Sequence, residues 1–124
     1  MLVMDDYQRG WALRYLREAK AEFAAAKKNP SLASGLILEA SRKAQAAIYY
    51  VLGTPTFITP IIRENAYKRR VIDDPILKCL VEVELTMQQI SHTANLDYDG
   101  VFKQVDGLIR TASDIVALFI DERA

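Results

Sequence analysis

SLASGLILEASRKAQAAIYYVLG, residues 31–53, is the stretch of sequence that decides the fold. Ser31 can cap a helix that runs to Leu52, and Gly53 supplies a C-terminal stop signal. One face of this helix is apolar and rich in small residues: Leu32, Leu36, Ala40, Ala44, Ala47, Ile48 and Val51. Because alanine side chains are short, this face predicts close packing against a neighbouring helix.

A long helix is predicted before this stretch and a short one after it. The first helix is expected from about Asp5, with Gln8 as its capping partner, to Lys28, because Asn29-Pro30 ends the helical pattern. Its apolar side contains Trp11, Ala12, Tyr15, Leu16, Ala19, Phe23 and Ala26. TPTFITP, residues 54–60, is not expected to propagate a helix, so the short helix is predicted from Pro60, capped by Thr59, to about Arg70.

Two further helices complete the pattern. Asp74-Pro75 opens a helix to about Ala94, with a 4-3-4-3 apolar seam of Ile76, Leu80, Val83, Met87 and Ile90. NLDYDG, residues 95–100, interrupts the chain, and the last helix is predicted from about Val101 to Glu122. Its apolar face consists of Val101, Phe102, Val105, Leu108, Ile109, Ala112, Val116, Phe119 and Ile120.

The helical period and short connectors predict an all-α fold: an antiparallel four-helix bundle with an additional short helix. No stretch alternates like a β-strand, and 124 residues are expected to form a single domain, 1–124. Sixteen basic residues balance sixteen acidic ones, so the overall charge predicts neither a nucleic-acid nor a membrane partner. The lone Cys79 and the lack of a signal-peptide or membrane-helix pattern favour the cytoplasm.

The common enzyme signatures are missing from the sequence, which contains no glycine-rich phosphate loop, Gly-x-Ser-x-Gly elbow or Cys-x-x-Cys pair. His92 is the only histidine, and it is predicted nearly opposite the apolar seam of its helix. Cys79 lies thirteen residues earlier on the same helix, about 20 Å away, and position 89 is Gln, so neither a Cys–His nucleophile nor a Glu-x-x-His metal site is expected. No cofactor is predicted, and His92 remains the alternative catalytic residue.

A mixed polar stripe lies on the second helix, away from its alanine face. Arg42, Gln45 and Tyr49, together with Leu38, follow 4-3-4 spacing. They are expected either to line a shallow cleft for a ligand or partner, or to pair locally and fill the edge of the bundle.

The short helix carries the basic segment RENAYKRR, residues 63–70. Arg63, Tyr67 and Arg70 share a face, flanked by Lys68 and Arg69, which supplies charge for phosphates and a ring for stacking. Nearby acidic residues partly cancel this charge, and a solvated face is the alternative interpretation.

Three apolar residues point to self-association. Val81 and Leu85 are predicted on the side of their helix away from its seam, and Leu118 interrupts the polar face of the last helix. A symmetric homodimer would cover them, while a central helix wrapped by the others in one monomer is the competing arrangement.

Residues 15–53 resemble the first two helices of HEPN-type helical domains, in which a Leu-, Glu- and Ala-rich helix precedes one with an Ala-rich core. DYDGVFKQVDGLIRTASDIVALFIDE, residues 97–122, is similar to the closing helix of that family, with its Tyr-containing turn. The resemblance implies a four- or five-helix bundle, often a homodimer and commonly paired with a small nucleotidyltransferase in toxin–antitoxin or defence modules.

The ribonucleases of that family carry Arg, four to six residues and then His. Here the positions that would hold the arginine before His92 are Leu85, Thr86 and Met87. The resemblance therefore implies a non-catalytic accessory module that binds a partner protein or a nucleotide. The alternative is a ribonuclease or nucleic-acid-binding protein that uses Arg63, Tyr67, Arg70 and His92.

Overall fold

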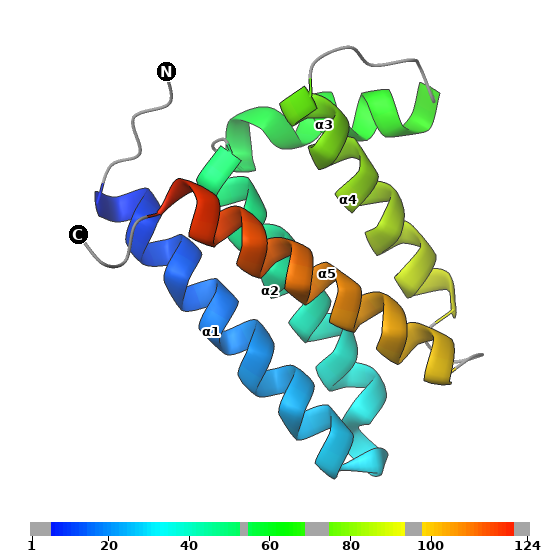
Figure 1. The fold of residues 1–124 in the computed structure, drawn as a ribbon. Coiled ribbons are helices and arrows are strands. Elements are labelled where there is room, and N and C mark those ends of the chain that lie inside the picture. The colour runs from blue at the N-terminus through cyan, green and yellow to red at the C-terminus, as the bar shows by residue number, and fades with distance from the viewer. Residues whose placement is uncertain (1–5, 53–54, 69–74, 94–97, 121–124) are drawn as a thin grey trace.

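The computed structural model describes residues 6–52, 55–68, 75–93 and 98–120, and all regular structure within these ranges is helical. The elements are α1 (Asp6–Lys28), the short 3₁₀ helix η1 (Pro30–Leu32), α2 (Ala33–Leu52), α3 (Pro55–Lys68), α4 (Pro75–Thr93) and α5 (Tyr98–Phe119) (Figure 1). The predicted all-α class is confirmed.

The α1–α2 hairpin is the most closely packed pair of helices in the structure. Ala12 and Ala19 on α1, and Ala40, Ala44 and Ala47 on α2, are completely buried. Short methyl side chains at these buried positions allow the two helices to approach closely. The prediction of close packing from the alanine face of residues 31–53 is confirmed.

The third helix of the core, α5, packs against both α2 and α1, and its ribbon passes in front of α2 in Figure 1. Phe23 of α1 and Phe102 of α5 have ring centroids 5.6 Å apart. The α3–α4 segment packs against α2 and α5, with Ile62, Leu80 and Ile90 fully buried. One hydrophobic cluster therefore includes side chains from all five α-helices.

The helix α2 begins at Ala33, one residue after the start that a cap at Ser31 predicts. Ser31 and Leu32 belong to η1, and Leu32 is 62% exposed rather than part of the apolar face. The predicted start of α1 at Asp5 lies outside the described residues. Gln8, predicted as the capping partner of that start, donates a hydrogen bond from Nε2 to the backbone oxygen of Tyr50, 3.4 Å away.

The start of α3 was wrongly predicted, because the helix begins at Pro55 and continues through Pro60. A proline at the first helical position costs nothing, since its missing N–H would be unpaired there anyway. Pro60 removes one backbone hydrogen bond, which interrupts the ladder at a single point but does not end this helix.

The bounds predicted for α4 are confirmed by the helix Pro75–Thr93, whereas α5 begins earlier than predicted. Helix α5 begins at Tyr98, three residues before the predicted start. The negative charge of Asp99 in its first turn stabilises the helix, because the N-terminal end of a helix carries a partial positive charge. Four residues of the predicted α4 seam, Leu80, Val83, Met87 and Ile90, are buried, whereas Ile76 is 37% exposed at the start of the helix.

We predict that Ala44→Leu lowers the free energy of unfolding by about 1–3 kcal/mol, because the added methylenes do not fit at a completely buried position of α2. The matched control is Ala24→Leu, which places the same side chain on an exposed position of α1 and should change stability by less than about 0.5 kcal/mol. Urea denaturation followed by circular dichroism measures both values. Equal effects of the two substitutions would contradict the close-packing account.

Candidate functional site

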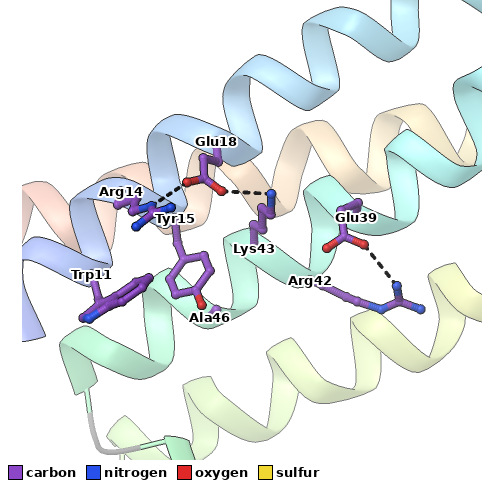
Figure 2. Close-up of a pocket in the computed structure, with 8 residues that line it drawn as sticks. All are labelled: Trp11, Arg14, Tyr15, Glu18, Glu39, Arg42, Lys43 and Ala46. Carbon is purple, nitrogen blue, oxygen red and sulfur yellow. Dashed lines mark hydrogen bonds and ion pairs between the residues drawn. The ribbon is translucent and has the colours of Figure 1, made fainter.

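An open groove of about 540 Å³ runs along the outer side of the α1–α2 hairpin. We call it the α1–α2 groove. It is lined from α1 by Trp11, Arg14, Tyr15 and Glu18, and from α2 by Glu39, Arg42, Lys43 and Ala46 (Figure 2).

Helical spacing explains why these side chains meet. The four α1 residues lie at positions i, i+3, i+4 and i+7, and the four α2 residues repeat the same spacing, so each set occupies one stripe of its helix. In Figure 2 the ribbon of α5 lies behind the hairpin, on the side away from the groove. The small side chain of Ala46 leaves room for the ring of Tyr15 between the helices.

One end of the groove is aromatic. The ring centroids of Trp11 and Tyr15 are 5.4 Å apart, and Tyr50 of α2 stacks on Tyr15 at 5.7 Å. The guanidinium carbon of Arg14 lies 5.0 Å from the centroid of the Trp11 ring, within cation–π range. Tyr7, 65% exposed, extends the cluster along α1 with an edge contact to Trp11.

A chain of ion pairs crosses the middle of the groove. Arg14 Nε lies 2.8 Å from Glu18 Oε2, and Lys43 Nζ of α2 lies 2.9 Å from Glu18 Oε1. Lys43 also contacts Glu22 at 2.8 Å, so its ammonium group ties two carboxylates of α1 to α2. The second carboxylate oxygen of Glu22 is buried without a hydrogen-bond partner.

These ion pairs shift the pKa values of Glu18 and Lys43. Hydrogen bonds from Arg14 and then Lys43 lower the pKa of Glu18 below its ordinary value of 4.5, while Glu22 and Glu18 raise the pKa of Lys43. Glu18 and Lys43 are therefore charged at neutral pH, and the middle of the groove carries both signs of charge.

Arg42 lies at the end of the groove opposite the aromatic cluster. Its side chain is 62% exposed, and its Nη1 lies 3.4 Å from Glu39 on the same helix. A long, solvent-exposed pair of this kind contributes little stability, so Arg42 can exchange Glu39 for another partner at small cost. Figure 2 shows Arg42 at the opposite end of the groove from Trp11.

The three residues predicted to share a cleft are not brought together at one site. Arg42 lines the α1–α2 groove, whereas Gln45 and Tyr49 contact α4. Gln45 Nε2 donates to the Tyr49 hydroxyl at 2.9 Å and to Glu84 Oε1 at 3.0 Å, and Tyr49 is only 5% exposed. Burial, followed by the negative charge of Glu84, raises the pKa of Tyr49. This pair therefore joins two helices and offers no open surface.

The predicted basic surface lies on α3. Arg63 is exposed, and Tyr67, one turn further along, is 89% exposed. Lys68 forms an ion pair with Glu64 at 2.7 Å. Arg69 and Arg70, predicted to extend this surface, lie outside the described residues.

The residues predicted for a dimer interface occupy different environments. Val81 was wrongly placed on an outer face: it is only 4% exposed and belongs to the buried hydrophobic cluster. Leu85 is partly buried against the core, and Leu118 is 79% exposed on α5. They do not form one continuous exposed patch.

His92 is exposed near the C-terminal end of α4. On the same helix, Cys79 is partly buried at a second groove, of about 300 Å³ between α4 and α5, and burial raises its pKa. In the described part of the chain, no three His, Cys, Asp or Glu side chains are grouped so that they could hold a metal ion.

Sequence reasoning missed most of the α1–α2 groove. Trp11 and Tyr15 were assigned to the apolar side of the first helix, and Arg14, Glu18 and Lys43 were not singled out. The spacing of Trp11 with Tyr15 and of Arg14 with Glu18 was visible in the sequence. The register of α1 against α2, which places Lys43 opposite Glu18, could not be read from the sequence.

Comparison with known proteins identified no matching family model, curated protein or solved structure. In the described residues, no helix is both long enough and apolar enough to cross a membrane.

We predict that stability falls on the acid side through Glu18. Because its pKa is lowered in the folded chain, the stabilisation is present above pH 4.5 and is lost as the pH falls through the lowered value. Glu18→Gln should therefore reduce the difference between the urea midpoints measured at pH 7 and at about pH 3. The control, Glu82→Gln on the exposed side of α4, should retain the wild-type difference; an equal reduction in both variants would contradict this assignment.

Proposed function

We propose that the chain is a non-catalytic, HEPN-like interaction module whose α1–α2 groove binds a partner protein. The observation that carries this proposal is the gathering of Trp11, Tyr15, Arg14 and Arg42 on one open groove. Tryptophan, tyrosine and arginine are the residues that most often dominate the energy of protein–protein contacts.

The chemistry of the groove supports a protein partner. The rings at the aromatic end already pack against one another, so little conformational freedom is lost when a partner covers them. The arginines and glutamates offer donors and acceptors at the rim, where they can select a partner by charge. By its resemblance to HEPN-type domains, the module fits a cytoplasmic toxin–antitoxin or defence system, with a small nucleotidyltransferase as the partner class.

A nucleotide is a second ligand class for the same groove. The rings of Trp11 and Tyr15 could stack on a base while Arg42 contacts a phosphate, and about 540 Å³ is within the usual range for a small-ligand site. Against this, the groove carries carboxylates as well as cations, which disfavours a strongly anionic ligand.

The alternative function, ribonuclease or nucleic-acid binding, depends on α3 and His92. The exposure of Tyr67 beside Arg63 favours contact with RNA, since a free ring can stack on a base. This function predicts that Tyr67→Ala and His92→Ala impair RNA binding or cleavage, and that groove variants do not.

We expect Trp11→Leu and Arg42→Glu each to weaken capture of a stoichiometric partner protein by at least about tenfold, because each removes an anchor of the groove. Affinity purification from the cells that make the protein, with quantification of the bound partner, measures this effect. The control, Arg17→Glu, changes an exposed α1 residue outside the groove and should retain the partner.

A partner retained equally by all of these variants would contradict the proposal. Trp11 is the only tryptophan, so its fluorescence tests the nucleotide alternative directly. Saturable quenching by ATP that is lost in Arg42→Glu would favour a nucleotide over a protein.

A further inference from the structure

We propose that the second groove, between α4 and α5, binds a small alkylamine, with the ammonium group on Glu82 and the hydrocarbon chain over Val83 and Leu108. We call it the α4–α5 groove. The residues that line it are different from those of the α1–α2 groove, so this inference goes beyond the proposed function and is tested independently of it.

The shape of the α4–α5 groove suits a short, linear ligand. Four residues of α4, beginning with Cys79, and four of α5, beginning with Gln104, line it at positions i, i+3, i+4 and i+7 of each helix. Each stripe covers two helical turns, about 10 Å along its helix. The volume of about 300 Å³ is at the lower end of the range for small-ligand sites.

The floor of the groove is apolar. Val83 and Leu108 are only 4% and 5% exposed, and Cys79 in the same lining is partly buried. Burial, followed by the negative charge of Glu82, raises the pKa of Cys79, so its thiol is neutral at pH 7. The floor can therefore hold a hydrocarbon chain, and the thiol adds no second negative charge.

The charge in the groove favours a cation. Of the described residues that line it, only Glu82 is charged. Glu82 is exposed, and no ion pair in the described part of the chain includes it. Its carboxylate is therefore available to a cation from outside, whereas the lining offers no positive group to an anion.

The hydrogen-bonding groups of the lining favour an ammonium group. Thr86 and Thr111 each donate the hydroxyl hydrogen to the backbone oxygen four residues earlier, at 2.9 and 3.0 Å. Their oxygens can then only accept, and the amide of Gln104 supplies a further acceptor oxygen. An alkylammonium group has three N–H donors and no acceptor. The lining therefore matches a protonated amine better than an alcohol or a carboxylate.

Gly107 keeps the groove open in the middle of the α5 stripe. A Cβ atom at this position would meet no neighbouring atom within 4 Å, so a larger side chain can enter the groove without displacing others. Leucine also has a higher helix propensity than glycine. We therefore expect Gly107→Leu to fill the site and to remain folded.

Titration with n-hexylamine at pH 7, followed by the backbone amide resonances in two-dimensional NMR, tests the proposal. We expect saturable shifts with a Kd on the order of 1 mM, as a ligand of this size in an open groove allows. n-Butylamine should bind about fourfold more weakly, roughly twofold per methylene, because an open groove buries the chain only in part. 1-Hexanol lacks the charge and should bind at least about tenfold more weakly than n-hexylamine.

Two variants with matched controls locate the ligand. Glu82→Gln should raise the Kd for n-hexylamine at least about tenfold, and Gly107→Leu should abolish saturable binding. Asp114→Asn on α5 and Gly35→Leu on α2 change exposed residues outside the groove and should bind like the wild type. Circular dichroism checks that each variant is folded.

No saturable shift of the wild type at about 20 mM n-hexylamine, roughly twenty times the expected Kd, would overturn the proposal. Equal binding of 1-hexanol would remove the role of Glu82, and binding retained in Glu82→Gln and Gly107→Leu would place the amine elsewhere; either result rejects the site. A lysine-bearing protein lost through Glu82→Gln, with no binding of n-hexylamine, would assign the groove to a protein side chain and reject a free amine.

Discussion

The close approach of α1 and α2 is the constraint on which the rest of the structure depends. It is possible because several completely buried positions of the two helices, among them Ala12, Ala19, Ala40 and Ala44, carry only methyl groups. Methyl groups alone fix no unique register, since one alanine packs much like the next. Lys43 supplies the missing specificity, because its ammonium group must lie between Glu18 and Glu22. Small residues set the distance between the helices, and the ion pairs set their alignment.

That alignment also creates the candidate site. With Lys43 opposite Glu18, Ala46 lies beside Tyr15, and Arg42 lies at the end of the groove opposite Trp11. The groove thus has an aromatic end, a charged centre and an arginine end without any loop contributing to it. Side chains mounted on two packed helices are held more firmly than side chains on loops. This rigidity suits recognition of a shaped surface by a binding module.

The sequence predicted the helical class and the alanine contact, because both depend on residue type and period within one segment. It failed where an effect depended on the tertiary structure. Pro60 looked like a helix start, yet the helix already begins at Pro55 and tolerates it. Val81 looked exposed, but it is buried in the hydrophobic cluster of the core. Arg42, Gln45 and Tyr49 lie on one stripe of α2, but different neighbouring helices divide that stripe into a groove and a buried contact.

Hydroxyl-radical footprinting of the native protein tests the central claim, that the α1–α2 groove is the surface used for binding, most directly. Aromatic side chains react readily when exposed, so Trp11 and Tyr15 report on the groove, while Tyr67 and Leu118, 89% and 79% exposed, serve as internal references on α3 and α5. The account predicts that binding of the partner protein lowers the modification of Trp11 and Tyr15 and leaves both references unchanged. Protection of Tyr67 or Leu118, with Trp11 and Tyr15 modified as in the free chain, would contradict it.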